Sequence, residues 1–171
     1  MIRRERHEDE AEISRLIDAA FGDFETSAFA EQIRASPGYV PELAFVTEEN
    51  GELVAHTMLS WVGLEGPGLD VLILTPMSVR PDRQRQGVGR ALVETALAAA
   101  DERGEPLVLV EGVPSYYPQF GFRSATELGL ERPDPRIPDA AWMVRPLNAY
   151  DPSLRGRVVY PAFFPPPPGH A

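Results

Sequence analysis

The chain has 171 residues, of which 43% are hydrophobic and 25% charged, a balance typical of a soluble globular protein with one sizeable core. Its net charge of −10 argues against non-specific binding of nucleic acid. The sequence holds no cysteine and no lysine, which excludes disulfides, thiolate metal sites, a cysteine nucleophile and a Schiff-base lysine. No apolar run approaches the roughly 20 residues of a membrane helix, and the N-terminus lacks a secretory pattern. We therefore expect a cytoplasmic protein that binds neither membranes nor nucleic acid.

The first part of the chain combines helical and strand patterns. Apolar residues from Ile13 to Phe21 recur at helical spacing and stop at Gly22. Asn50-Gly51 is a strong signal for a two-residue hairpin turn between two β-rich stretches. In chain order we expect a strand at 2–6, a helix ending at residue 21, a helix at 27–35, a loop at 36–41, and strands at 43–48 and 53–62.

The second part begins with the apolar run Leu69–Val79, which predicts a long strand. Pro76 cannot donate to a β-ladder, so we expect a bulge or the end of pairing there. Beyond it we expect a helix at 88–103 stopped by Gly104, a strand at 107–111, a short helix within 113–122, and strands at 141–147 and 157–160. This order predicts an α+β fold with a mixed sheet. Residues 165–171 predict a proline-rich, extended tail.

The junction between the long strand and the helix at 88–103 concentrates four arginines and the pair Gly87 and Gly89. The first amides of a helix lack intrahelical partners and carry partial positive charge, so this junction predicts an anion site, most naturally for phosphate. A Walker A loop needs a lysine, and a dinucleotide fingerprint needs a small residue where Leu92 stands. Both are excluded.

What remains is Gln84-x-x-Gly87-x-Gly89 between a strand and a helix. This pattern resembles the pyrophosphate loop of the GNAT superfamily of N-acetyltransferases, and the run Tyr116-Tyr117-Pro118-Gln119-Phe120-Gly121-Phe122 resembles the Tyr-x-x-x-Gly-Phe segment of that family. The likeness covers roughly residues 2–122, and within the superfamily it is to small bacterial predicted N-acetyltransferases. It implies one N-acetyltransferase domain over 1–164, with helices on both faces of a mixed sheet in three layers.

The resemblance also implies acetyl-CoA as co-substrate, bound where the fourth and fifth strands of the family splay apart. The backbone of Met77, Ser78 and Val79 would then hold the pantetheine arm. The amides of the loop would cradle the pyrophosphate, together with arginine charge; these residues are Arg85, Gln86, Gly87, Val88, Gly89 and Arg90. Ser115 stands where many relatives carry an asparagine that contacts the cofactor, so that contact is the one the sequence leaves in doubt.

Tyr117 lies four residues before Gly121, where the family commonly places its general acid. We expect it to protonate the departing thiolate, with Tyr116 as the alternative. Packing beneath the loop is the competing interpretation for both rings.

The general base is open between two residues. His56 lies on a strand that borders the acceptor side in the family, although a lone histidine among apolar neighbours is more often structural. Glu111 ends the strand at 107–111 and could take a proton through water. The family often uses a water chain with no single base. No residue cluster has metal-ligand spacing, so we expect no metal. No cysteine is available for an acyl-enzyme, so we expect direct transfer in a ternary complex.

Two other functions remain open: a non-catalytic acyl-CoA-binding or regulatory module on the same fold, and an unrelated binder of phosphate ligands. The acceptor is a small amine or a protein amino group, and the negative charge favours a cationic amine only weakly. The apolar stretch Val158-Val159-Tyr160 is one that can pair between subunits, which allows a homodimer.

Overall fold

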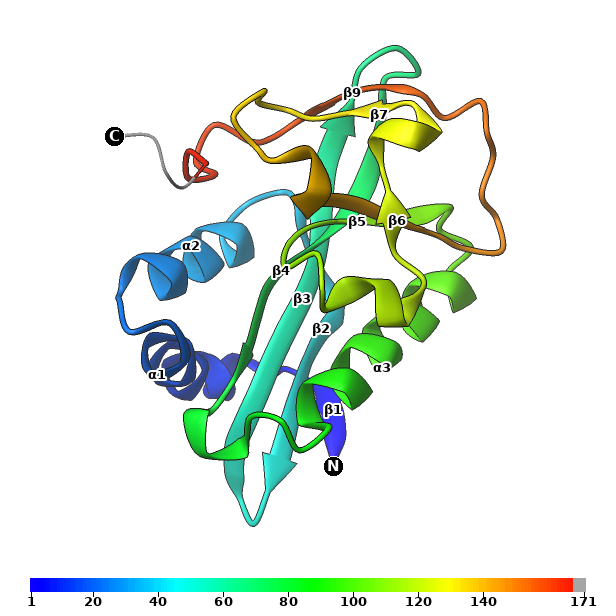
Figure 1. The fold of residues 1–171 in the computed structure, drawn as a ribbon. Helices are drawn as coiled ribbons and strands as arrows, with labels where there is room; N and C mark the ends of the chain where they lie inside the picture. Colours follow the sequence, from blue (N-terminus) through cyan, green and yellow to red (C-terminus); the bar gives the residue numbers. More distant parts are fainter. Residues whose placement is uncertain (168–171) are drawn as a thin grey trace. The chain divides into compact units, whose positions relative to one another are not determined.

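The structure, a computed structural model, describes residues 1–167. These residues fall into two units (Figure 1). The first consists of residues 1–60 and 74–100, and the second of residues 61–73 and the chain from 101 onward. The expectation of one N-acetyltransferase domain over 1–164 stays a prediction. Residues 168–171, including His170 and the end of the expected proline-rich tail, lie outside the described part.

Strands of the first unit are adjacent in the order β1, β2, β3 and β4. They are β1 (Ile2–Arg4), β2 (Tyr39–Glu49), β3 (Glu52–Leu64) and β4 (Leu69–Val79), the last two continuing into the second unit. The β1–β2 and β2–β3 pairs are antiparallel. Asn50 and Gly51 both adopt positive φ, +52° and +80°, which a two-residue type I′ hairpin turn requires. The predicted hairpin is therefore confirmed.

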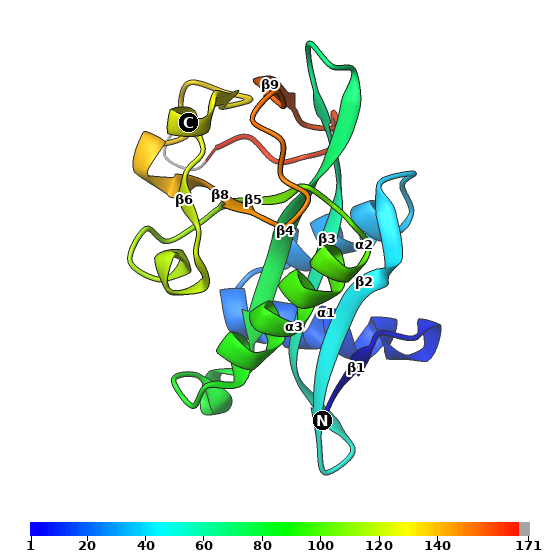
Figure 2. The same cartoon turned by 90° about the vertical axis from the view of Figure 1, so that its right-hand side faces the viewer.

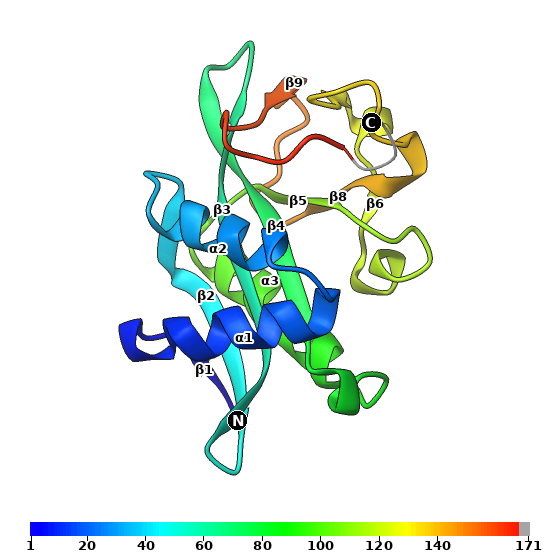
Figure 3. The same cartoon turned by 90° about the vertical axis from the view of Figure 1, so that its left-hand side faces the viewer.

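Helices lie on both faces of this unit's strands (Figures 2 and 3). The helices α1 (Glu10–Phe21) and α2 (Glu25–Arg34) cover one face, and α3 (Val88–Glu102) covers the other. The apolar stripes of α1 and α3 are buried, as their periodicity predicts; the residues are Ile13, Leu16, Ile17, Leu92, Val93 and Ala96. Gly22 ends α1 in the left-handed conformation with φ +72°. The predicted three layers are thus present within the first unit.

Several boundaries differ from the sequence-based expectation, two of them by more than one residue at the start of an element and for a clear physical reason. The helix α2 begins at Glu25 rather than at residue 27, because the Asp23 carboxylate accepts hydrogen bonds from the Glu25 and Thr26 amides at 3.1 Å each. The strand β2 begins at Tyr39, so the expected loop at 36–41 is too long. Pro41 is tolerated in β2 because the register with β3 shifts between Tyr39 and Ala44.

In the second unit the strand order is β4, β5, β8 and β6. The pair β4–β5 is parallel, whereas β5–β8 and β8–β6 are antiparallel, so the sheet is mixed as predicted. The strands added here are β5 (Leu107–Glu111), β6 (Arg123–Ser124), β7 (Leu130–Glu131), β8 (Trp142–Pro146) and β9 (Gly156–Val159). Short 3-10 helices complete the chain at His7–Asp9, Pro81–Arg83, Tyr117–Phe120, Thr126–Leu128 and Asp139–Ala141.

Trp142 is at the centre of the second unit's core. Its ring is fully buried, and its indole N–H donates to the Leu130 carbonyl oxygen at 2.9 Å. Leu109, Val144 and Val158 belong to the same cluster. Trp142 is therefore a core residue of this unit.

The strand β9 pairs within the chain on both sides, antiparallel with β3 and parallel with β7. Val158 points into the core, whereas Val159 is 43% exposed. A homodimer stays a prediction.

Candidate active site

The loop between β4 and α3 has the shape of an anion cradle. Arg85 and Gly87 adopt left-handed φ angles of +61° and +83° on either side of Gln86. The Gly87 carbonyl accepts the first helical hydrogen bond of α3, from the Ala91 amide at 3.1 Å. The amides that follow Gly87 therefore lie at a helix N-terminus, where a 15-residue helix supplies unpaired donors and partial positive charge.

Two glutamine side chains hold the backbone of this loop by hydrogen bonds. Gln84 donates from Nε2 to the Val79 carbonyl, and Gln86 donates to the Asp82 carbonyl, both at 3.1 Å. A Cβ at Gly87 would meet no atom within 4 Å, so the glycine is required there for its backbone angle and leaves open space beside the loop.

The four arginines of the junction do not have equal roles. Arg80 is bound to Glu52 and Asp82, Arg83 to Glu49 and Asp82, and Arg90 to Glu94. Arg85 is exposed and has no ion pair within residues 1–167. Of the arginines predicted to neutralise a phosphate, Arg85 is thus the one whose charge is available.

The end of β4 carries Met77, Ser78 and Val79, as the sequence predicts. Ser78 is 3% exposed, and its hydroxyl has no hydrogen-bond partner among the residues that the structure describes. The preceding Pro76 carbonyl accepts a hydrogen bond from Thr57 Oγ1 at 3.1 Å. This segment therefore has a fixed backbone in the first unit.

Tyr117 belongs to the second unit and is 8% exposed. Its ring lies against Gly112, where an added Cβ would come within 2.3 Å of Cε2. Tyr116 and Phe122 contact it edge-on at centroid distances of 5.1 and 5.5 Å. Burial raises the pKa of the Tyr117 hydroxyl, so the group stays protonated near neutral pH. No hydrogen bond to this hydroxyl is present within residues 1–167.

The two neighbours of Tyr117 differ in exposure from it. Tyr116 is half-buried and contacts Phe120 as well as Tyr117, while Ser115 is exposed. Of Ser115, Tyr116 and Tyr117, only Tyr117 is buried, with its ring against Gly112.

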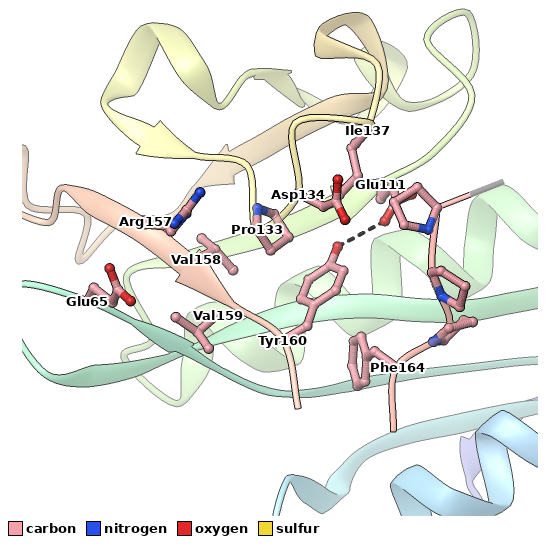
Figure 4. A pocket seen from close by; sticks show the side chains of 13 residues that line it. Glu65, Glu111, Pro133, Asp134, Ile137, Arg157, Val158, Val159, Tyr160 and Phe164 are labelled. Atoms are coloured by element: carbon pink, nitrogen blue, oxygen red, sulfur yellow. Dashed lines mark hydrogen bonds between the residues drawn. The ribbon is translucent and has the colours of Figure 1, made fainter. Parts of the chain in front are cut away.

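Glu111 is the last residue of β5. The next residue, Gly112, is the one against which the Tyr117 ring packs. Glu111 lines a pocket of about 320 Å³ that lies wholly within the second unit (Figure 4). The Tyr160 hydroxyl donates to Glu111 Oε2 at 3.0 Å. Burial raises the pKa of Glu111, the charge of Asp134 adds to the rise, and the Tyr160 hydrogen bond opposes it. A carboxyl with a raised pKa is a better proton acceptor than an ordinary one.

His56 lies in a different environment, in the first unit. It is fully buried on β3, with Nε2 2.7 Å from Glu5 Oε2. The same carboxylate accepts from Arg34 Nε at 2.9 Å and from the Tyr39 hydroxyl at 2.6 Å. Burial alone would raise the pKa of Glu5, but His56 and Arg34 outweigh burial and lower that pKa to about 2. His56 Nδ1 has no partner within residues 1–167.

Sequence reasoning missed several of these side chains. Glu5, Arg34 and Tyr39 are separated from His56 by up to 51 positions, and no spacing rule connects them. Tyr160 had a signal, because strand alternation places it on the same face as the core residue Val158.

Within residues 1–167 no group of three His, Asp or Glu side chains is placed to hold a metal ion. In the same part of the chain, no helix combines the length and the apolar character needed to cross a membrane.

Fold, loop and tyrosine segment together define the class of protein. The chain belongs to the acetyltransferase (GNAT) domain family, whose model matches residues 1–125. It is therefore an acyltransferase, and the family resemblance expected from the sequence is confirmed.

Two relatives come from Escherichia coli. YjhQ (strain K12), described as an uncharacterized N-acetyltransferase, is 29% identical over 156 residues, 88% of this chain and 86% of YjhQ. YhbS (strain K12), described in the same way, is 28% identical over 109 residues, 63% of this chain and 65% of YhbS.

Two solved structures are similar. The E. coli YhbS structure in complex with CoA has a TM-score of 0.85 at 26% identity. The matched region covers 94% of this chain and 88% of the YhbS chain. A GNAT acetyltransferase from Brucella melitensis in complex with acetyl-CoA has a TM-score of 0.76 at 27% identity. The matched region covers 95% of this chain and 96% of the Brucella chain. The expected fold is thereby confirmed.

Proposed function

We propose that this protein transfers the acetyl group of acetyl-CoA to a primary amine, by direct transfer in a ternary complex. The observation that carries the proposal is the loop before α3, where Arg85 and Gly87 hold left-handed angles and the first helical amides stay open. Two similar structures, at 26% and 27% identity, contain CoA and acetyl-CoA. Their ligands support the same co-substrate for this chain.

In this proposal the backbone amides from Arg85 to Arg90 bind the pyrophosphate, and the Arg85 guanidinium adds charge. The backbone of Met77 to Val79 binds the pantetheine arm, and the Ser115 hydroxyl supplies one further contact. Acetyl-CoA supplies the acetyl group as a thioester, which the amine nitrogen attacks as the bond from carbon to sulfur breaks.

Glu111 is the proposed general base. An amine is mostly an ammonium ion near neutral pH and must lose a proton before it attacks. The Glu111 carboxylate accepts that proton, which converts the ammonium to a neutral amine and the carboxylate to a carboxylic acid. The raised pKa of Glu111 favours this transfer.

Tyr117 is the proposed general acid. Its hydroxyl donates a proton to the sulfur of the departing thiolate, so that CoA leaves as a thiol, and the second proton that the amine nitrogen loses restores the Tyr117 hydroxyl. Because burial raises its pKa, the hydroxyl holds its proton until that moment. The absence of a hydrogen bond to this hydroxyl within residues 1–167 supports a role toward substrate.

We assign His56 to the structural network around Glu5 rather than to catalysis. Its side chain is fully buried, and Nε2 is engaged by the Glu5 carboxylate. His56 also lies outside the residues that line the pocket of Figure 4.

Calorimetric titration with acetyl-CoA tests the proposal. Gly87→Glu places a side chain and a negative charge at the cradle and should abolish detectable binding. Gly104→Glu is the matched control, since Gly104 has φ +80° and, like Gly87, has no atom within 4 Å of an added Cβ. Equal binding by the wild type and Gly87→Glu would contradict the loop's role.

Turnover separates an enzyme from a binding module. Thiol release with a panel of primary amines should occur with the wild type and fall at least about 100-fold in Tyr117→Phe. Acetyl-CoA binding without thiol release for any amine would support a non-catalytic module instead.

A further inference from the structure

The pocket that Glu111 lines has the size of a small-molecule site. Its volume of about 320 Å³ is at the lower end of the range for ligand pockets. Every residue around it belongs to the second unit, and the described end of the chain, Pro165 to Pro167, forms part of its wall. The pocket is therefore formed by the second unit alone, and its wall includes the C-terminal segment of the described chain.

One end of the pocket is polar, and among residues 1–167 its lining there includes no cationic side chain. The Glu111 carboxylate and the Tyr160 hydroxyl meet there, and the Asp134 carboxylate points to the same place (Figure 4). Asp134 is neutralised by Arg136, which donates from Nε at 2.9 Å. Glu111 has no ion pair within residues 1–167, and its described partner is the neutral Tyr160 hydroxyl. A partly buried carboxylate without a counter-charge is stabilised by a cation that enters the pocket.

The rest of the lining combines apolar side chains with the charged Glu65 and Arg157. The Phe164 and Tyr160 rings pack with centroids 4.7 Å apart. Pro133, Val159 and the proline segment add apolar surface. Such a wall accepts an aromatic or branched alkyl group, and the ring faces also attract a neighbouring ammonium.

Arg157 sets a limit on the charge of the ligand. It lies on the side of the pocket away from Phe164 (Figure 4), is exposed, and has no ion pair within residues 1–167. Glu65 lines the pocket on the same side, and its carboxylate offsets this charge, so a second ammonium on the ligand would gain no net stabilisation there.

We propose that this pocket binds the acceptor as a small primary monoamine with one aromatic or branched apolar body, its ammonium placed on the Glu111 carboxylate. The inference rests on the proposed acetyl transfer and narrows its substrate class. It selects monoamines over diamines, and an ammonium over the neutral alcohol of the same shape.

The test uses the full chain and three probes: phenethylamine, 2-phenylethanol and 1,4-diaminobutane. Saturation-transfer NMR should detect binding of phenethylamine and not of the alcohol at the same concentration. In thiol-release assays with acetyl-CoA, kcat/KM for phenethylamine should exceed that for the diamine at least tenfold. Equal values for the two amines would overturn the proposed selection.

Two variants locate the ammonium. Glu111→Gln should weaken phenethylamine binding at least tenfold in the NMR experiment, which does not depend on turnover. Glu127→Gln is the matched control, because Glu127 is an exposed carboxylate of the same unit, outside the pocket, and its replacement changes the net charge equally. Equal binding by the two variants would overturn the inference, and thermal unfolding checks that both are folded.

The outcomes distinguish this inference from the proposed function. If acetyl-CoA binds and amines turn over, but Glu111→Gln behaves like Glu127→Gln, the pocket inference fails and acetyl transfer stands. If no amine turns over, yet phenethylamine binds the wild type and not Glu111→Gln, the pocket inference stands and acetyl transfer fails.

Discussion

Two glutamates, one in each unit, have opposite environments. Glu5 in the first unit accepts hydrogen bonds from Arg34, Tyr39 and His56, and its side chain is 2% exposed. Glu111 in the second unit accepts from Tyr160 and lines an open pocket. The pKa of Glu5 is lowered to about 2, whereas that of Glu111 is raised. The difference separates a carboxylate that stabilises the fold from the one that we propose as general base.

The comparison shows that burial alone does not decide the role of an acid. Burial raises the pKa of both groups, and it is the largest effect on each. The hydrogen bonds from His56 and Arg34, together with the Arg34 charge, reverse that effect at Glu5, while Glu111 has a neutral hydroxyl and the charge of Asp134 nearby. A buried carboxyl without a cationic partner is thus the one to examine for catalysis.

Replacing Glu5 should produce the largest effect on stability. Glu5→Gln leaves the buried Arg34 guanidinium without its counter-charge, and we expect a loss of about 3–5 kcal/mol in the free energy of unfolding. Urea denaturation at pH 7 measures it. The exposed Glu8 provides the control, since Glu8→Gln should change the free energy by under about 0.5 kcal/mol. Similar losses of unfolding free energy in Glu5→Gln and Glu8→Gln would mean that Glu5 does not stabilise the fold.

Acid should remove the same stabilisation in the wild type. The folded-state pKa of Glu5, about 2, lies below its ordinary value of 4.5, so its contribution is complete above about pH 5 and is lost as the pH falls toward 2. The expected loss is about 3 kcal/mol. Urea denaturation across this range should show a smaller loss in Glu5→Gln than in the wild type, and parallel curves for the two proteins would be inconsistent with this pKa.

Replacing Glu111 should reverse the pattern. Glu111→Gln removes a charge that burial and Asp134 destabilise, so the free energy of unfolding at pH 7 should equal or exceed the wild-type value. Turnover with phenethylamine should fall about 100-fold. Denaturation and thiol-release assays on one preparation measure both quantities. A destabilised variant with unchanged turnover would make Glu111 a structural residue.

Removing the Tyr160 hydroxyl should have the smallest effect. The hydrogen bond from Tyr160 lowers the pKa of Glu111, so in Tyr160→Phe that pKa rises further. Because the base acts when deprotonated, the acidic limb of the profile of kcat/KM against pH should shift to higher pH by up to about one unit. A shift in the opposite direction, or a change in kcat/KM with no shift, would mean that Tyr160 does not act through Glu111.

Much of the fold could be predicted because its longer elements carry strong patterns. The strand Leu69–Val79 and the strand Leu107–Glu111 have the expected bounds, and α3 differs by one residue at its end. The strands β6 and β7 have two residues each, too few for any periodicity.

The site could be predicted only where chemistry follows local spacing. The glycine at position 87 predicts the loop conformation from local sequence. The ion pairs of Arg80 and Arg83 could not be predicted in this way, because their partners Glu52 and Glu49 lie on the β2–β3 hairpin. The contact between Tyr160 and Glu111 spans 49 positions. Such pairings depend on strand register and are not visible before the sheet is known.

Carboxyl NMR titration of Glu5 and Glu111, with and without phenethylamine, tests the contrast most directly. The account predicts that Glu5 titrates near pH 2 in both samples. Glu111 should titrate above its ordinary value without the amine and at lower pH with it, because an ammonium stabilises the carboxylate. A Glu111 pKa that is not raised, or that the amine leaves unchanged, would contradict the account.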